Sequence, residues 1–297
     1  MITNIFTAGT LAATIRIATP LLFAAIGAAL SLKVNLFNIA IEGFMLIAAF
    51  LAVFLSSRLG DPYLALAITL LITTATGLLY GFVTISLGSD HIIAGLGFNL
   101  LATGLTTWVL QSILHSPGGF MDPSVEGLPI FRLSFLPPDS FLGEVLAGHD
   151  ILTYSAWILA VLAYLFVHQS GAGLRLRATG EHPLAATTAG IRTVLWQYLA
   201  AGLTGTFCGL AGASISLSHL QMFSQGMTAG RGFIAFAAAT FAAGNIPGTA
   251  LMAVLFAFFG SVAIRLEGFG LPTQFVQMIP YLVTLMALFF ARRRNRQ

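Results

Sequence analysis

Long apolar runs constrain this chain more than any other feature. Hydrophobic residues make up 57% of it and charged residues only 8%, whereas soluble domains carry about a quarter charged residues. About 20 apolar residues in a helix cross a bilayer, and helices satisfy their own backbone hydrogen bonds there. No alternating pattern typical of a membrane barrel is present. The candidate spans are residues 10–31, 37–57, 63–87, 91–111, 151–168, 193–217, 231–244, 247–265 and 274–291, of which the seventh is short. We therefore predict an all-α integral membrane protein with about nine transmembrane helices (8–10) in a single domain, 1–297.

The arginines predict the orientation of the spans, because basic residues accumulate on cytoplasmic loops. The tail Arg292–Arg296 is strongly basic, and the segment 169–192 holds three arginines, Arg175, Arg177 and Arg192. Both are expected in the cytoplasm, which places the N-terminus outside if there are nine spans. The longest connection, 112–150, is acidic and rich in proline and glycine. It is expected outside the cell, either as a solvated linker or as a lid or docking surface for an external binding protein.

Several functional classes are excluded by what the chain lacks. Its pI of 9.4 could indicate nucleic acid, but the arginines lie at predicted membrane edges, so no nucleic-acid partner is expected. The six histidines show no metal-ligand spacing, and the single cysteine, Cys208, permits no intrachain disulfide. Val34 follows the single lysine, Lys33, where a phosphate-binding loop needs a hydroxyl residue. We expect no metal or cofactor on this chain, so that ATP and magnesium would belong to a partner subunit.

Four residues in or beside the spans are candidates for a translocation path: Asn38, Glu42, Asn99 and Phe233. Asn38 and Glu42 are four residues apart and would share one helix face. A charge at the centre of a bilayer costs roughly 2.5–3.5 kcal/mol on insertion scales, so it usually faces a cavity or a partner group. Hydrogen bonds between helices would explain the same polar residues without any role in transport. Both interpretations stay open at this point.

A weak internal similarity joins two distant segments. Glu42–Ala49 reads Glu-Gly-Phe-Met-Leu-Ile-Ala-Ala, and Arg231–Ala238 reads Arg-Gly-Phe-Ile-Ala-Phe-Ala-Ala. The two would run in opposite directions across the membrane, as inverted repeats of transporters do. Gly205 and Gly209, in the span 193–217, form a pair of small residues that lets helices approach closely. We predict a packing role for this pair and an inverted-repeat fold for the chain.

Four stretches together resemble the integral-membrane permeases of bacterial ABC importers, in the branched-chain amino acid/ribose-type superfamily. They are Asn35–Leu46, Gly95–Leu101, Arg175–Ile191, and Gly230–Ala235 followed by Asn245–Gly248. Within the superfamily the chain looks most similar to simple-sugar and nucleoside permeases. Two positions depart from the family pattern: Ser31-Leu-Lys-Val-Asn35 lacks the usual acidic–basic pair with glycine, and His182-Pro183-Leu184 stands where Asn-Pro-Glu is common.

The resemblance implies partners and sites. It implies cytoplasmic ATP-binding subunits, a second permease (a paralogue or the same chain), an extracytoplasmic substrate-binding protein, and residence in the bacterial cytoplasmic (inner) membrane with a cytoplasmic C-terminus. It also implies that the segment 169–192 contains the helix that couples the permease to the ATPase. The implied coupling residues are Arg175, Arg177, Gly180, Glu181, His182, Pro183, Ala185, Ala186 and Gly190. The expected function is inward movement of a nucleoside or simple sugar, driven by ATP that another subunit hydrolyses.

Other functions remain alternatives at this stage. An ion-coupled secondary transporter would use Glu42 as its carboxylate, and a branched-chain amino acid ABC permease would share the fold and the partners. A structural membrane subunit that transports nothing is the third alternative. An intramembrane enzyme is not expected, because the sequence contains none of the common hydrolase or metalloprotease motifs.

Overall fold

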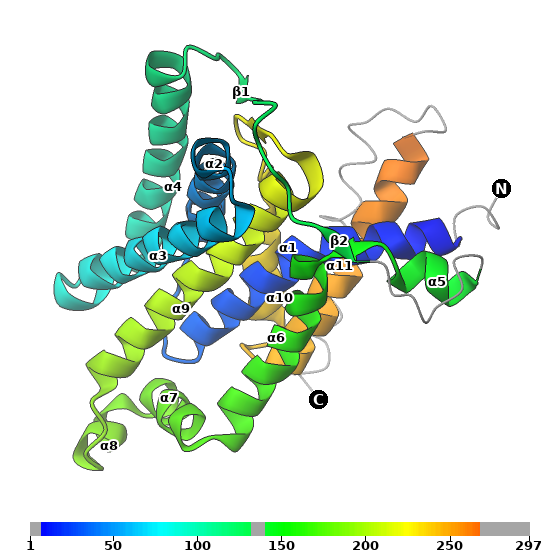
Figure 1. Cartoon of the computed structure of the whole chain (residues 1–297). Helices are drawn as coiled ribbons and strands as arrows, with labels where there is room; N and C mark the ends of the chain where they lie inside the picture. The colour runs from blue at the N-terminus through cyan, green and yellow to red at the C-terminus, as the bar shows by residue number, and fades with distance from the viewer. Residues whose placement is uncertain (1–6, 132–139, 268–297) are drawn as a thin grey trace.

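The computed structural model describes residues 7–131 and 140–267, and helices dominate them (Figure 1). The long helices are α1 (Ala8–Leu32), α2 (Ile41–Leu59), α3 (Pro62–Gly81), α4 (His91–Trp108), α6 (Ile151–Gln169), α9 (Thr193–Ala213) and α11 (Ile246–Glu267). The shorter ones are α5 (Phe141–Leu146), α7 (Gly171–Glu181), α8 (Pro183–Thr188) and α10 (Arg231–Phe241). Three π-helical turns, η2 (Phe82–Ser86), η3 (Val109–Ile113) and η4 (Ser214–Leu220), extend α3, α4 and α9.

The described residues contain 7 helices that are long and apolar enough to cross a membrane. They match the predicted spans from 10–31 to 247–265, apart from 231–244, to within a few residues. That segment forms α10, whose 11 residues cover only about 16 Å, roughly half of the hydrocarbon core. The ninth predicted span, 274–291, lies outside the described residues. The predicted helical architecture is therefore confirmed for the described residues, which are mostly helical and contain only short strands besides. The count of nine stays a prediction.

Polar residues and glycine set the helix boundaries. The Asp61 carboxylate accepts from the backbone N–H groups of Tyr63 at 2.8 Å and Leu64 at 3.3 Å, at the start of α3. Asp90 caps α4 in the same way, and Asp150 accepts from the N–H of Thr153 at 3.2 Å at the start of α6. These carboxylates satisfy N–H groups that have no partner inside the helix. Gly60, with φ +65°, ends α2 in a left-handed conformation.

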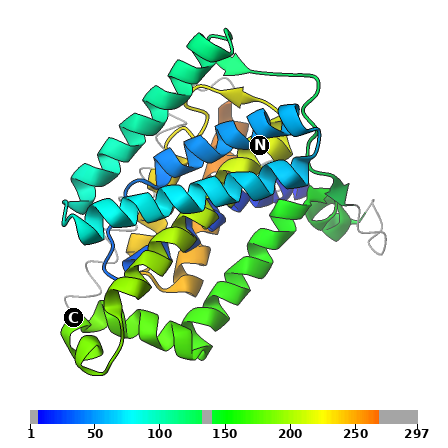
Figure 2. The same cartoon turned by 60° about the vertical axis from the view of Figure 1, so that its left-hand side comes forward.

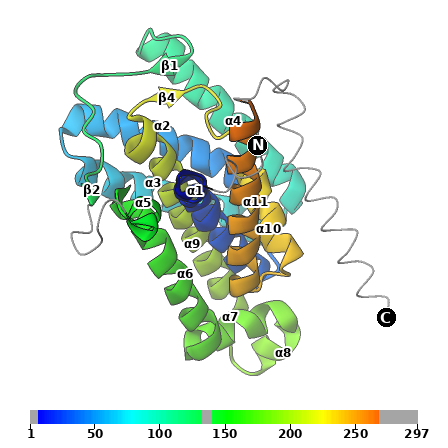
Figure 3. The ribbon, with the colours of Figure 1, turned by 90° about the vertical axis from the view of Figure 1, so that its right-hand side faces the viewer.

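Helix α1 runs through the centre of the protein. Figure 3 views it nearly end-on, with α6, α9, α10 and α11 around it. Hydroxyl pairs join it to three neighbours: Thr14 to Ser261 of α11 at 2.8 Å, Thr19 to Thr153 of α6 at 3.4 Å, and Ser31 to Thr204 of α9 at 2.7 Å. In a lipid environment such hydrogen bonds and close packing hold helices together, because the bilayer provides no hydrophobic force between them.

The two ends of the bundle differ (Figures 1 and 2). Helices α7 and α8 occupy one end, which we call the α7 end. Residues 114–131 and 140–150 occupy the opposite end, which we call the loop end. There β1 (Gly119–Phe120) pairs antiparallel with β4 (Phe223–Ser224), and β2 (Ile130–Phe131) pairs antiparallel with β3 (His149–Asp150). The described part of the predicted loop 112–150 is therefore attached to the bundle.

Glycines allow α3 and α9 to cross in contact. A methyl group at Gly205 would overlap the carbonyl oxygen of Thr73, and one at Gly209 would overlap the Thr73 hydroxyl. The packing role predicted for this pair is confirmed.

We expect the Gly205→Ala substitution to lower the melting temperature of the detergent-solubilised protein. The added methyl group must push two backbones apart, at a cost of about 1–3 kcal/mol. Gly104→Ala is the matched control: a methyl group at this position of α4 would have nothing within 4 Å, and alanine favours helix there. Equal melting temperatures for the two variants, measured by thermal-shift fluorescence, would contradict this account of the helix crossing.

Candidate functional site

The α7–α8 segment forms a small exposed element at the α7 end. The Ser170 hydroxyl accepts from the N–H of Gly173 at 2.9 Å and starts α7; His182 and Pro183 break the helix, and Pro183 starts α8. The α7–α8 segment lies within the segment 169–192, which was expected to contain the coupling helix. Of the nine predicted coupling residues, Arg175, Glu181, His182, Pro183, Ala185 and Gly190 are exposed. Leu184, which the sequence analysis did not select as a coupling residue, is 86% exposed in the first turn of α8.

The other three predicted coupling residues face the protein. Ala186 is buried, and Arg177 and Gly180 are half-buried. A methyl group at Gly180 would overlap the carbonyl oxygen of Lys33. The Asn35 side-chain amide donates to the Gly180 carbonyl oxygen at 2.5 Å. Gly180 is therefore a contact point between α7 and the chain that follows α1.

Residues 33–40, which we call the connecting loop, join α1 to α2 and lie against α7. Val34 and Leu36 pack with Leu176 of α7 and with Ala200 and Ala201 of α9 in a small separate apolar cluster. This cluster fixes the connecting loop to the α7 end. The loop and α7 also interact through charge. Burial lowers the pKa of Lys33, the Glu181 carboxylate partly raises that pKa again, and Arg177 lowers it further.

Glu42, in the first turn of α2, holds the start of α10. Its carboxylate accepts from the Thr228 hydroxyl at 2.6 Å, from the Gly230 N–H at 2.8 Å and from the Gly232 N–H at 2.7 Å. A carboxylate at a helix N-terminus satisfies N–H groups that have no intrahelical partner and complements the helix dipole. A methyl group at Gly232 would lie 2.6 Å from the Cα of Glu42, so glycine is needed for this approach.

Asn99 holds the start of α2 in a similar way. Its side-chain oxygen accepts from the Gly43 N–H at 2.7 Å, and its amide donates to the Ile39 carbonyl at 3.0 Å. Gly43 and Gly232 are the equivalent glycines of the two similar segments, and in each case a side-chain oxygen from another element receives the glycine N–H. α2 and α10 start beside each other and diverge. The last turn of α2 reaches the loop end, where the Ser56 hydroxyl donates to the Glu126 carbonyl at 2.9 Å.

The end of α10 lies at the opposite end of the bundle, against the start of the connecting loop. The Lys33 ammonium donates to the Ala243 carbonyl at 3.5 Å, and the Phe37 ring contacts Phe236 edge-on at 4.7 Å between centroids. The connecting loop therefore contacts α7 on one side and α10 on the other. The sequence analysis selected neither Asn35 for its bond to Gly180 nor Thr228 for its bond to Glu42. Asn35 has a φ of +59°, a conformation that asparagine tolerates better than most residues.

The four predicted path residues thus separate by environment. The hydrogen-bonding groups of Glu42 and Asn99 are occupied by helix N-termini and backbone groups. Asn38 is fully buried; its side-chain oxygen accepts from the Ala40 N–H at 2.9 Å, and its amide nitrogen has no partner among the described residues. Phe233 is exposed. For Glu42 and Asn99 the described structure favours the interpretation that polar residues hold helices together.

Comparison with known proteins places the chain in a family. The sequence profile of the branched-chain amino acid transport system permease component matches residues 10–288. The chain belongs to this permease family. A nucleoside ABC transporter permease of Lactococcus lactis is 31% identical to the chain, over 91% of the chain and 88% of that protein. A guanosine ABC transporter permease of Bacillus subtilis is 30% identical, over 93% and 89%.

A third relative, from Haloferax volcanii, is provisionally named a glucose ABC transporter permease and is 30% identical over 96% of the chain and 92% of that protein. No solved structure matches the chain. The resemblance in the four sequence stretches is confirmed by these matches, which extend over nearly the whole chain. The protein is an ABC importer permease of the membrane, and it is a transporter subunit and not an enzyme.

Proposed function

We propose that this permease imports a nucleoside or a simple sugar across the bacterial inner membrane, using ATP hydrolysed by a separate cytoplasmic subunit. The proposed substrate class rests on the names of its relatives, which are nucleoside, guanosine and glucose permeases. The partners we infer are two cytoplasmic ATP-binding subunits, a second permease, and an extracytoplasmic substrate-binding protein. ATP and magnesium would bind to the ATPase, and this chain would carry no cofactor.

The α7–α8 segment is the proposed docking element for the ATPase. Its position at one end of the bundle, its exposed polar residues and the projecting Leu184 support this role. The arginines of the segment support a cytoplasmic position for the α7 end, so that the loop end would face outward toward the binding protein. The basic tail Arg292–Arg296 would then also be cytoplasmic. Exposed apolar side chains on α4, such as Ile93 and Leu100, suit a lipid bilayer or the second permease.

Transmission from the ATPase to the centre of the membrane would use the connecting loop. A movement of α7 reaches this loop through Gly180 and Asn35, and the loop leads directly into Glu42, which holds the start of α10. A short helix that begins inside the membrane is typical of transporters built from inverted repeats. The matching glycine contacts of α2 and α10, and their divergence from one starting point, support an inverted repeat in this chain.

An ion-coupled mechanism through Glu42 is the less favoured alternative. A coupling carboxylate must exchange a proton or cation with water, whereas both oxygens of Glu42 accept hydrogen bonds from Thr228, Gly230 and Gly232. ATP-dependent uptake that requires the ATPase subunit would separate the two mechanisms, because a secondary transporter would work without that subunit.

The docking proposal predicts that Leu184→Asp lowers recovery of the ATPase with the tagged permease by about tenfold. Removing an apolar anchor from an interface and burying a charge in its place commonly costs more than about 1.4 kcal/mol, which is a factor of ten in affinity. Met121→Asp is the matched control, since Met121 is 76% exposed near the loop end. Partners are identified by mass spectrometry after gentle solubilisation. Loss of the ATPase with Met121→Asp and not with Leu184→Asp would reverse the assigned orientation.

A further inference from the structure

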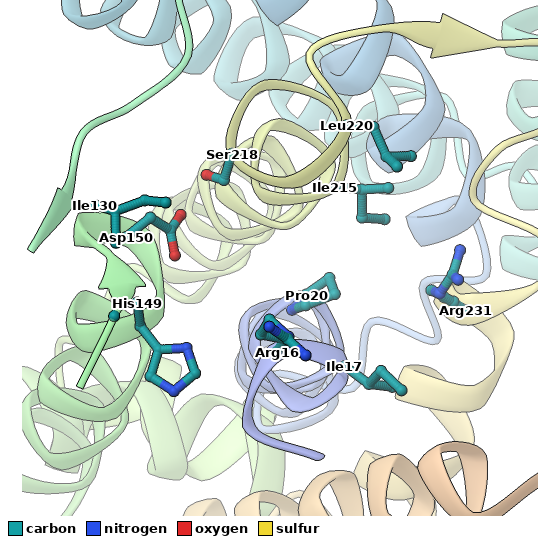
Figure 4. Close-up of a pocket in the computed structure, with 11 residues that line it drawn as sticks. Arg16, Ile17, Pro20, Ile130, His149, Asp150, Ile215, Ser218, Leu220 and Arg231 are labelled. Atoms are coloured by element: carbon teal, nitrogen blue, oxygen red, sulfur yellow. The ribbon is translucent and has the colours of Figure 1, made fainter. Parts of the chain in front are cut away.

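A cavity of about 470 Å³ lies among α1, β2, β3, η4 and the start of α10. Its volume falls within the usual range for small-molecule sites. Figure 4 shows Asp150 and Ser218 on one side, Arg231 on the other, and the apolar side chains of Pro20 and Ile215 between them. Because β2 and β3 belong to the loop end, the cavity lies on the side where a solute would arrive. None of the residues predicted for the translocation path lines it.

Two polar atoms on one wall have no hydrogen-bond partner among the described residues. Asp150 is only 4% exposed; its Oδ1 accepts from the N–H and hydroxyl of Thr153, while its Oδ2 is unpartnered. The Ser218 hydroxyl is also buried and unpartnered. An unsatisfied buried polar group costs free energy, so such groups normally meet a ligand or ordered water. An ionised carboxylate oxygen can only accept, and a serine hydroxyl can donate or accept.

Two arginines line the cavity as positively charged hydrogen-bond donors. Arg16 lies in the first half of α1, is exposed toward the cavity, and makes no hydrogen bond or ion pair with any described residue. The Arg231 guanidinium donates to the carbonyl oxygens of Met227 at 2.8 Å and Thr228 at 3.4 Å, which fixes it at the start of α10. A charge inside an apolar helix is costly unless it faces a cavity or a partner. Arg16 therefore offers unused donors to whatever occupies the cavity.

The carboxylate and the two arginines together select the charge of the solute that the cavity can bind. The Asp150 carboxylate, which forms no ion pair with a described residue, disfavours an anion, and the two arginines disfavour a cation. These charges favour a solute without net charge, and L-leucine serves below as the zwitterionic probe. A neutral solute with hydroxyl donors for Asp150, acceptors for Arg16 and an apolar face for Pro20 and Ile215 suits these groups.

Building on the proposed function, we propose that this cavity binds the transported solute on the extracytoplasmic side, and that the solute is a neutral polyhydroxylated molecule of nucleoside or sugar size. Asp150 and Ser218 bind its hydroxyl groups, and Arg16 donates to its acceptors. Arg231 begins α10, and Glu42 holds the residues on both sides of it, Gly230 and Gly232, so a bound solute lies against the helix that the ATPase is proposed to move.

Solute protection of a cysteine tests the site without relying on transport rates. The single native cysteine, Cys208, is buried, which gives a low background. Leu220 lines the cavity and is 51% exposed, so Leu220→Cys should react with a polar methanethiosulfonate reagent in the complete transporter. We expect guanosine or D-glucose, whichever the wild-type transporter takes up, to slow this labelling and to leave labelling of Met121→Cys unchanged. Protection by L-leucine instead, or no protection in a transporting preparation, overturns the proposal.

Uptake by charge variants gives the second measurement. Asp150→Asn keeps the capping oxygen of α6 and removes the charge, and we expect it to raise KM for the transported solute about tenfold, the effect of losing one hydrogen bond to a charged group. Arg16→Gln should act similarly. Asp122→Asn, at a turn of the loop end where Asp122 accepts from Ser124 at 2.9 Å, is the control. Unchanged KM in both cavity variants overturns the site while the importer function stands. A wild-type transporter that takes up neither probe overturns the proposed substrate class and the site together.

Discussion

Replacing Glu42 with alanine should reduce solute uptake by the reconstituted transporter at least about 100-fold. The substitution removes the acceptor of three hydrogen bonds and leaves the N–H groups of Gly230 and Gly232 without a partner. Each buried unsatisfied group costs about 1–3 kcal/mol, and a total near 3 kcal/mol corresponds to a factor of about 100. The start of α10 is then no longer fixed against α2, so the melting temperature should fall together with uptake.

Two comparisons make the Glu42 prediction specific. Glu42→Gln keeps the side-chain shape and one acceptor oxygen, so we expect a smaller loss, about tenfold, from one charge-assisted bond. Glu126→Ala removes an exposed carboxylate at the loop end and should leave uptake unchanged. Uptake is measured in proteoliposomes, with the recovered ATPase as a check on assembly. Normal uptake by Glu42→Ala would show that the contact does not hold α10 in the transport cycle.

Gly180→Val should separate ATP hydrolysis from uptake. Any side chain at this position overlaps the Lys33 carbonyl, so α7 must move away from the connecting loop and the bond from Asn35 must lengthen. Because the exposed residues of α8 are unchanged, the ATPase should still bind and hydrolyse ATP. We expect uptake per ATP hydrolysed to fall about 50-fold, since steric insertion into a packed backbone contact commonly costs about 1–3 kcal/mol.

A control for Gly180 lies in the same helix. A side chain at Gly171 would have nothing within 4 Å of its Cβ, so Gly171→Val should keep the ratio of uptake to hydrolysis. Asn35→Ala removes the bond to Gly180 without a steric clash and should give a partial loss. If Gly180→Val instead loses the ATPase altogether, the residue belongs to the docking surface. If it transports normally, the connecting loop does not carry the movement.

The sequence predicted the helices well because each helix depends on the hydrophobicity of its own segment. Spans such as 10–31 and 151–168 were predicted from apolar runs of about 20 residues, the length that crosses a bilayer as a helix. They match α1 and α6 closely. The family was also evident from short polar motifs such as Arg175–Ile191. The short α10 was visible as a shorter apolar run, although its start inside the bundle was not.

The residue roles depended on contacts between distant parts of the chain. From the sequence, Glu42 was a candidate either for a translocation path or for a structural role. In the structure both of its oxygens hold residues 228–232, more than 180 positions away. The cavity is formed by Arg16, Asp150, Ser218 and Arg231, which lie on separate elements and show no shared sequence pattern. Side-chain type and helical spacing cannot reveal such partners, because neither specifies which helices are neighbours.

The sequence by itself therefore determined that this protein lies in a membrane, that it is built from helices, and which family it belongs to. Hydrophobicity and backbone hydrogen bonding act within one segment, so each span can be recognised alone. Only the tertiary structure decided that Glu42 holds α10 and that Gly180 contacts the connecting loop. It also decided that Asp150 and Ser218 line a cavity with atoms that have no partner in the described part of the chain. Those outcomes depend on helix packing at glycine contacts, where the position of one backbone against another sets which polar groups can meet.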